Sequence, residues 1–221
     1  MAHQPKIKYV IWDWNGTLIN DAWLFVELMN DELRTRNLPQ ISIDDYRNYF
    51  TFPVKKYYEV LGFDFSKEDF KEVGYNFIQK FKKRKFEANL FSTTNHILEL
   101  TKNLGIQQSI VSAQEHQLLN KTVKHYNLNH YFESVVGIEH YYADDKIKIA
   151  KSIRKNIKCD NAEIIIVGDS IHDFEVSKAL NVRCILFSQG HYSKKRLLNC
   201  GCEIVDNHQE LEQFYDSKIC G

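Results

Sequence analysis

Two hydrophobic segments of the chain end directly in acidic residues. The segment Val10–Leu18 reads VIWDWNGTL and places Asp13 after one hydrophobic run, and Glu163–Asp173 reads EIIIVGDSIHD and places Asp169 after another. Gly16 permits a sharp turn after the first run. We therefore expect Asp13 at the carboxyl end of a strand, which is where open parallel sheets bind their ligands.

The second acidic segment carries a further carboxylate, because Asp173 follows Asp169 by four residues. A helix that begins near Ser170 would direct Asp173 back over the strand end. Two carboxylates in one cleft repel each other, and Mg²⁺, which prefers octahedral oxygen ligation, relieves that repulsion. The segment predicts a magnesium site; the alternative is a helix cap at Asp169 with Asp173 in solvent.

Two more polar residues stand at expected element ends. Ile110–Ser112 ends a third hydrophobic run in a hydroxyl, and Ala113–Glu115 is expected to open a helix. A serine there either caps the helix or holds a phosphoryl oxygen beside free backbone N–H groups. Lys146 opens the helix before the Glu163–Asp173 segment, where a cation is unfavourable to the helix dipole, and this placement suggests a specific task.

These residues need a sheet to position them, and the chain predicts one. Short β-branched runs alternate with helical patterns, which indicates βαβ units and a Rossmann-like, mostly parallel sheet flanked by helices, an α/β fold. The expected strands are Tyr9–Trp12, Gln108–Val111, Ser134–Ile138, Glu163–Val167, Cys184–Phe187 and Glu203–Val205.

One region breaks this alternation. Between about Asp21 and Lys85 the pattern is helical only, with apolar faces such as Ala22, Val26, Met29 and Leu33, and Phe70, Val73, Phe77 and Phe81. We expect a core of residues 1–20 and 86–221 and a helical cap of residues 21–85. The basic segment Lys80–Lys85 is either a solvated helix end or an anion site.

Composition limits the kind of partner. The chain has 221 residues with 29 Lys plus Arg and 29 Asp plus Glu, so a broad basic face for nucleic acid is not expected. We expect no secretory segment and no membrane span. Five scattered cysteines argue against a disulfide framework and favour the cytoplasm; Cys200 and Cys202 are half a metal site or incidental.

The chain resembles the haloacid dehalogenase-like (HAD) superfamily, whose members are mostly Mg²⁺-dependent phosphatases and phosphotransferases. The resemblance rests on the set and order of five residues: Asp13, Ser112, Lys146, Asp169 and Asp173. The helical insertion looks like the small cap of its phosphoglycolate-phosphatase-like branch. The resemblance implies a hydrolase of a small phosphorylated metabolite, with no nucleic acid or membrane partner, acting as a monomer or homodimer.

The resemblance also implies a role for each residue. Asp13 would be the nucleophile that forms an aspartyl-phosphate. Ser112 would bind the transferring phosphoryl group, and Lys146 would neutralise charge, with Lys148 as the alternative. The Mg²⁺ ligands would be Asp13, the main-chain carbonyl of Asn15, Asp169 and Asp173. The expected substrate contacts are Thr17, Ala113, Lys55 and Lys56.

The chain departs from the family's D-x-D motif at Asn15, where the phosphatases carry the aspartate that protonates the leaving oxygen and activates water. An amide cannot exchange that proton near neutral pH, and loss of a general acid/base costs about 10²–10⁴-fold in rate. Three outcomes are open. The protein is a slow phosphatase of esters with good leaving groups such as acyl phosphates, or a non-catalytic phosphate-ester-binding or regulatory protein, or Asn15 deamidates before Gly16 and restores an aspartate.

Neighbouring chemistries of the superfamily fit the residues less well. Dehalogenases need no Mg²⁺, and phosphonatase-like members use a cap lysine as Schiff base, for which Lys55 and Lys56 are available. The loop Tyr49–Lys56 is the expected substrate loop. We expect Arg47, Lys55 or Lys56 beside an anionic substrate tail. Elsewhere in the chain, we expect His191, in the turn after a strand end, within reach of the cleft, and His172 on a helix surface.

Overall fold

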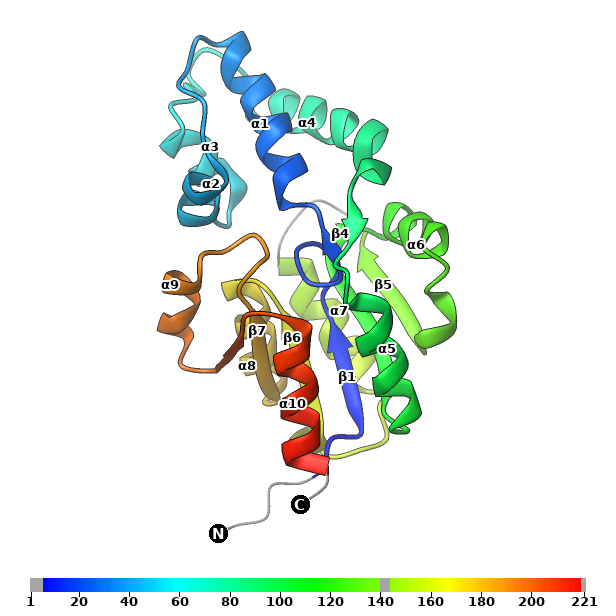
Figure 1. Cartoon of the computed structure of the whole chain (residues 1–221). Helices are drawn as coiled ribbons and strands as arrows, with labels where there is room; N and C mark the ends of the chain where they lie inside the picture. Colours follow the sequence, from blue (N-terminus) through cyan, green and yellow to red (C-terminus); the bar gives the residue numbers. More distant parts are fainter. Residues whose placement is uncertain (1–5, 140–143, 220–221) are drawn as a thin grey trace.

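The computed structural model describes residues 6–139 and 144–219. Its main element is a six-stranded sheet in the order β5-β4-β1-β6-β7-β8, in which every neighbouring pair is parallel (Figure 1). All six predicted strands are confirmed; they are β1 (Tyr9–Trp12), β4 (Gln107–Glu115), β5 (Ser134–Ile138), β6 (Ile164–Gly168), β7 (Arg183–Phe187) and β8 (Glu203–Val205).

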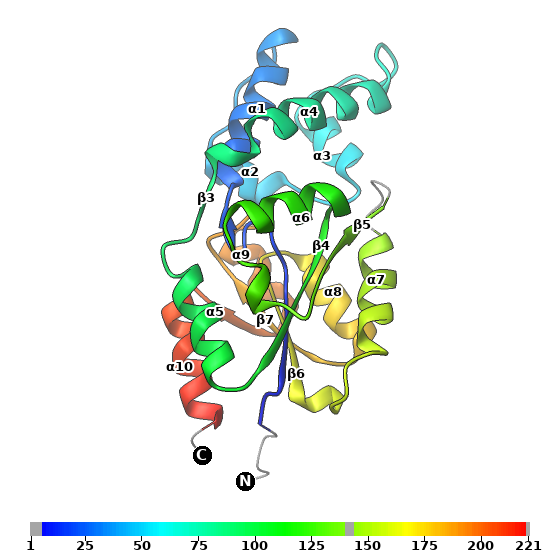
Figure 2. The same ribbon diagram turned by 90° about the vertical axis from the view of Figure 1, so that its right-hand side faces the viewer.

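Both faces of the sheet are buried, which explains the continuous hydrophobic runs. Successive residues of β1 alternate between the faces: Val10 and Trp12 belong to one hydrophobic cluster, and Tyr9 and Ile11 to another. The first cluster includes residues of α5 (Thr94–Asn103), α6 (His116–His125) and α10 (His208–Ile219). The second includes residues of α7 (Asp144–Arg154) and α8 (Ile171–Leu180), so helices cover both faces (Figure 2).

Four helices lie above the carboxyl ends of the strands in Figures 1 and 2. They are α1 (Ala22–Thr35), α2 (Ile43–Tyr49), α3 (Val54–Val60) and α4 (Phe70–Arg84). Both predicted apolar faces, on α1 and α4, contribute to a hydrophobic cluster of their own. We call these four helices and their connections, residues 22–84, the helical layer.

A short antiparallel pair that the sequence did not predict joins the helical layer to the sheet. The chain leaves through β2 (Ile19–Asn20) and returns through β3 (Asn89–Leu90), with Ile19 opposite Leu90. Two-residue strands are too short for a period-2 pattern to show in the sequence. The predicted cap boundaries, 21 and 85, lie just inside this pair.

The expected helix at Ala113–Glu115 is wrong. β4 continues to Glu115, which pairs with Ile138 after a register shift, and α6 begins at His116. The physical reason is the cap: the Glu115 carboxylate accepts the backbone N–H groups of Gln117 and Leu118, which fixes the helix start there.

The basic segment lies at the end of α4, as a solvated helix end does. Lys80 pairs with Glu32 at 2.5 Å, and Arg84 pairs with Glu27 at 2.7 Å. The cysteines of the described chain, Cys159, Cys184, Cys200 and Cys202, form no disulfide, and Cys220 lies outside the described residues. Within the same residues, no helix combines the length and apolarity that a membrane crossing needs.

Candidate active site

Three acidic side chains meet at the carboxyl edge of the sheet. Asp13 follows β1, Asp169 follows β6, and Asp173 lies in the first turn of α8. One carboxylate oxygen from each lies within 4.8 Å of the others. The three side chains are almost fully buried, so the structure brings together the acidic residues that the sequence singled out.

The first turn of α8 holds this cluster in place. Ser170 caps the helix, and the Asp173 Oδ2 atom accepts the backbone N–H groups of Asp169 at 3.2 Å and Ser170 at 3.0 Å. The backbone N–H of His191 donates to Asp169 Oδ2 at 2.5 Å. Asp173 therefore points back over the strand end, as predicted, and does not lie in solvent.

Two glycines make room for Asp169. A Cβ atom added at Gly16 would lie 2.4 Å from Asp169 Oδ2, and one added at Gly190 would lie 2.2 Å from it. Gly16 also has φ +73°, in the left-handed region that favours glycine. The backbone thus forms a cradle around this carboxylate that any larger residue would fill.

One buried lysine of the described chain faces the three carboxylates. Lys146 Nζ donates to Asp13 Oδ1 and to Asp173 Oδ1, both at 2.5 Å. Burial opposes its charge, but the two carboxylates hold the pKa of Lys146 above its ordinary value. Lys148, the alternative for this role, is exposed and does not line the cavity described below.

The cluster carries more negative charge than one lysine offsets. Burial raises the pKa of Asp13 to about 6 and that of Asp169 to about 8. Burial acts on Asp173 in the same direction, but Lys146 and the hydroxyl of Ser170 hold the pKa of Asp173 below its ordinary value. Buried carboxylates that resist ionisation are suited to a divalent cation, and three oxygen donors match the preference of Mg²⁺.

Ser112 and Ala113 line the same cavity from β4. Ser112 is buried, and its Oγ accepts the backbone N–H of Gln114 at 3.1 Å. Thr17 is also buried but does not line the cavity. The predicted phosphate contacts Ser112 and Ala113 are therefore at the site, and the Thr17 side chain is not.

A buried hydrogen-bond network that the sequence analysis missed surrounds Asn15. Asn15 Nδ2 donates to Asp21 Oδ2 at 2.6 Å, and the His191 Nε2 atom lies 3.1 Å from Asp21 Oδ1. The hydroxyl of Tyr46 lies 2.7 Å from His191 Nδ1. Asp21 also accepts the backbone N–H of Gly16 at 3.0 Å. Asp21 thus fixes the amide at position 15.

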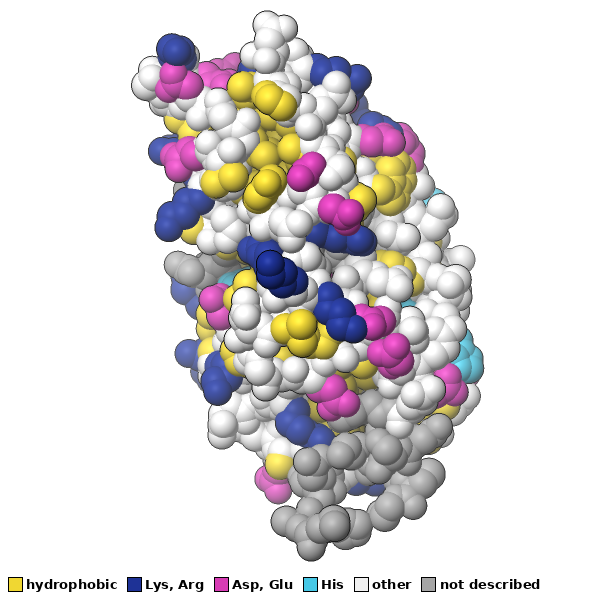
Figure 3. All heavy atoms as spheres, turned by 60° about the vertical axis from the view of Figure 1, so that its left-hand side comes forward, with side chains coloured by type: hydrophobic (Ala, Val, Ile, Leu, Met, Phe, Trp, Pro, Cys, Tyr) yellow, Lys and Arg dark blue, Asp and Glu magenta, His cyan; other side chains and the backbone are white. Residues whose placement is uncertain are grey.

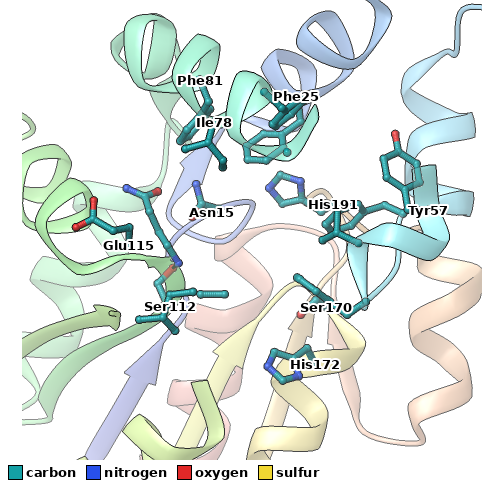
Figure 4. Close-up of a pocket in the computed structure, with 18 of the residues that line it drawn as sticks. Asn15, Phe25, Tyr57, Ile78, Phe81, Ser112, Glu115, Ser170, His172 and His191 are labelled. Carbon is teal, nitrogen blue, oxygen red and sulfur yellow. Dashed lines mark hydrogen bonds between the residues drawn. The ribbon is translucent and has the colours of Figure 1, made fainter. Parts of the chain in front are cut away.

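A cavity of about 630 Å³ extends from the acidic cluster into the helical layer (Figure 4). In Figure 4, Phe25, Ile78 and Phe81 lie above it, and Ser112, Ser170 and His172 lie below. Its walls from the helical layer are rich in aromatic side chains: Phe25, Tyr46, Phe50, Phe52, Tyr57, Tyr58, Phe70, Tyr75, Phe77 and Phe81. Figure 3 shows hydrophobic side chains gathered over this upper part of the molecule.

Two predictions about histidines have different outcomes. His191 lines the cavity, as expected. His172 also lines it and is buried, so its expected place on a helix surface is wrong. The reason is tertiary: the ring of Phe52, from the loop between α2 and α3, lies 5.6 Å from the His172 ring and covers this turn of α8.

The predicted substrate loop is at the cavity, but its cations are not. Phe50, Phe52 and Val54 line the cavity. Lys55 and Lys56 are exposed and do not line it, and Lys55 pairs with Glu59 at 3.9 Å, so these two lysines gain no support as substrate contacts or as a Schiff base.

Arg47 does not line the cavity either. Its guanidinium donates to the carbonyls of Gly190 at 2.9 Å and Gln189 at 2.6 Å. It therefore ties α2 to the loop that carries His191, and this arrangement gives no support to the predicted contact with an anionic substrate tail.

Comparisons with known proteins agree with this geometry. Residues 10–187 match the family model described as haloacid dehalogenase-like hydrolase. The chain is 22% identical over 187 residues to the proposed pyrophosphatase PpaX of Caldanaerobacter subterraneus, covering 81% of each chain. Two solved structures have the same fold. One is a predicted phosphatase from Clostridium acetobutylicum (21% identity, TM-score 0.76, covering 95% of this chain and 98% of that one). The other is a proposed phosphoglycolate phosphatase from Lactobacillus delbrueckii (16% identity, TM-score 0.78, covering 96% and 99%).

Proposed function

Because this chain belongs to the haloacid dehalogenase-like hydrolase family, we propose that it is a Mg²⁺-dependent phosphatase that works through an aspartyl-phosphate at Asp13. The observation that carries the proposal is the buried lysine between two carboxylates: Lys146 contacts Asp13 and Asp173 at 2.5 Å, beside Asp169. The expected substrate is a small phosphorylated metabolite, and the expected location is the cytoplasm.

Asp13 is the residue suited to attack phosphorus. One of its carboxylate oxygens forms a bond to phosphorus, and the ester P–O bond breaks as the leaving oxygen takes the electron pair. Water then attacks the same phosphorus and gives up a proton to solvent, the bond to Asp13 breaks, and inorganic phosphate leaves as the carboxylate is restored. Lys146 opposes the rise that burial causes in the pKa of Asp13, and it offsets charge on the phosphoryl oxygens, the main source of catalysis in phosphoryl transfer.

The metal would be held by Asp13, Asp169 and Asp173 together with the main-chain carbonyl of Asn15. The Gly16 and Gly190 cradle around Asp169 and the excess of buried carboxylates over lysine both fit a cation at this position. When bound, Mg²⁺ supplies positive charge that stabilises the transferring phosphoryl group. Ser112 would hold a phosphoryl oxygen on the opposite side of the site.

Asn15 is the residue that sets this site apart. Its amide is tied to Asp21, so it can present a hydrogen bond to the leaving oxygen or to water but cannot give or take a proton there. Deamidation of Asn15 requires the Gly16 nitrogen to attack the Asn15 side chain, and Asp21 holds both groups in hydrogen bonds. We therefore expect Asn15 to persist as an amide.

Phosphate release from phenyl phosphate tests the proposal. We expect Mg²⁺-dependent turnover by the wild type, loss on chelation with EDTA, and at least a 10³-fold loss in Asp13→Asn. Asp44→Asn removes an exposed carboxylate of α2 outside the cavity and is the matched control with unchanged activity. Turnover that survives in Asp13→Asn would refute the nucleophile. A wild type that binds the ester without releasing phosphate would favour the non-catalytic alternative.

A further inference from the structure

We propose that the substrate of this site is an aryl phosphate, the phosphate monoester of a large, uncharged phenol. This inference rests on the proposed phosphatase function and names its substrate class. Two features carry it independently of each other. One is the shape and chemistry of the cavity in the helical layer, and the other is the fixed amide at position 15.

The walls of the cavity suit a flat, uncharged group of the substrate. Rings line it from several elements, among them Phe25 and Phe81 with centroids 4.9 Å apart, and Phe50 and Phe52 with centroids 5.4 Å apart. Lys71 is the only charged side chain that the described helical layer contributes to the wall. Aromatic walls favour aromatic ligands through stacked and edge-to-face contacts. Away from Lys71, a carboxylate at this position would lose its hydration without gaining a charged partner from the described helical layer.

A glycine in the middle of α4 keeps this space open. Gly74 lies on the cavity face of the helix with Phe70, Ile78 and Phe81. A Cβ atom added at Gly74 would meet nothing within 4 Å, so the helix packing does not require a glycine there. Glycine is unfavourable in a helix interior. Its presence at the cavity wall is explained by the room that it leaves for a ligand.

The chemistry at position 15 selects the same class. No residue at that position can protonate the leaving oxygen, because Asn15 is an amide held by Asp21. The bond to phosphorus must then break with the leaving oxygen taking the electron pair and departing as an anion, which solvent protonates afterwards. A phenolate bears that charge far better than an alkoxide does. Between the two kinds of monoester, an aryl ester therefore needs the missing acid far less than an alkyl ester does.

The test separates ring size from leaving ability with three esters. Biphenyl-4-yl phosphate and phenyl phosphate differ in the size of the phenol, and biphenyl-4-ylmethyl phosphate keeps the large body but releases an alcohol. We expect kcat/KM for biphenyl-4-yl phosphate to exceed that for phenyl phosphate at least tenfold. We expect it to exceed that for biphenyl-4-ylmethyl phosphate at least 10²-fold.

Filling the cavity tests the same inference by mutation. Gly74→Leu is expected to lower the preference for biphenyl-4-yl over phenyl phosphate at least tenfold. Asn76→Leu places the same side chain on an exposed position of α4 outside the cavity, and it should leave both rates unchanged. A preference that Gly74→Leu does not change would overturn the placement of the phenol in this cavity.

The outcomes distinguish this inference from the proposed function. If phosphate is released but phenyl phosphate is used as well as biphenyl-4-yl phosphate, the phosphatase stands and the large phenol is wrong. If biphenyl-4-ylmethyl phosphate is used as well as biphenyl-4-yl phosphate, the phosphatase stands and the aryl class is wrong. If no ester is hydrolysed, the proposed function fails. Calorimetry of the wild type with the intact esters then decides: binding of biphenyl-4-yl phosphate at least tenfold tighter than phenyl phosphate supports the class, and equal binding overturns it.

Discussion

Replacement of Asn15 by aspartate should change which esters the protein hydrolyses. Asn15 Nδ2 now donates to Asp21 Oδ2 at 2.6 Å. Asn15→Asp replaces that donor with a second carboxylate beside a buried one. At an effective dielectric constant of about 20, two unit charges about 4 Å apart repel by about 4 kcal/mol. That energy raises the pKa of the introduced carboxyl by about 3 from its ordinary value.

An acid with that pKa keeps its proton close to neutral pH and can donate it to a leaving oxygen. We expect kcat/KM of Asn15→Asp for biphenyl-4-ylmethyl phosphate to rise about 10²-fold. The rise for biphenyl-4-yl phosphate should stay below about tenfold, because a phenolate needs little help. Phosphate release from both esters between about pH 3.5 and 9 measures this.

A second change tests the electrostatic reasoning directly. Asp21→Asn, added to Asn15→Asp, removes the neighbouring negative charge, so the pKa of the introduced carboxyl falls. The rate of alkyl-ester hydrolysis falls as the pH rises through the pKa of the introduced carboxyl. The pH at which this fall occurs should therefore be lower by about 3 in the double variant. Equal activation of both esters, or a pH profile that Asp21→Asn leaves in place, would refute this account of position 15.

Three further predictions follow from the surroundings of the site. Gly190→Ala places a Cβ 2.2 Å from Asp169 Oδ2, so Mg²⁺ affinity measured by calorimetry should fall at least tenfold; unchanged affinity would exclude Asp169 as a ligand. Lys146→Met leaves two buried carboxylates without their cation, so the metal-free protein should lose about 3–5 kcal/mol in urea unfolding, and added Mg²⁺ should recover part of it. Burial lowers the pKa of His208 from 6.5 to about 4. Between these two values the unfolded chain binds a proton at His208 and the folded chain does not, so the free energy of unfolding falls as the pH drops from 6.5 towards 4. Between pH 7.5 and 5 the wild type should lose about 2 kcal/mol more than His208→Gln, and equal losses would contradict the burial of a neutral imidazole.

The sheet and the acidic cluster could be predicted because their signals are local. Each strand is a short hydrophobic run, and Asp13 and Asp169 follow such runs directly in the sequence. Parallel topology then places both strand ends at one edge of the sheet. The four-residue spacing to Asp173 fixes its position once a helix begins after Ser170. Nothing beyond neighbouring residues is needed for these inferences.

The network around Asn15 could not be predicted, because its partners are distant in the chain. Tyr46 and His191 are separated by 145 residues and meet only through the packing of α2 on the loop after β7. The sequence around Tyr46 does not predict a contact with His191, and the sequence around His191 does not predict one with Tyr46. Asp21, six residues after Asn15, was visible only as the expected start of the insertion.

The aromatic cavity was hidden for a different reason. Helical periodicity predicts that Phe70, Phe77 and Phe81 share a face, and they do. Periodicity does not distinguish a face that packs against a neighbour from one that borders an open space. Gly74 was the available signal, because a glycine within a helix interior has a cost that needs an explanation.

The β2–β3 pair has a consequence for how this protein could have diversified. The chain leaves the sheet at Asn20 and returns at Asn89, and those two residues pair directly. Any segment whose two ends can be held side by side could replace the residues between them without moving β1 or β6. Exchange of this one stretch of sequence would give the same phosphate chemistry a new substrate. Evolutionary relationships inferred from the residues at the strand ends therefore need not agree with those inferred from the helical layer.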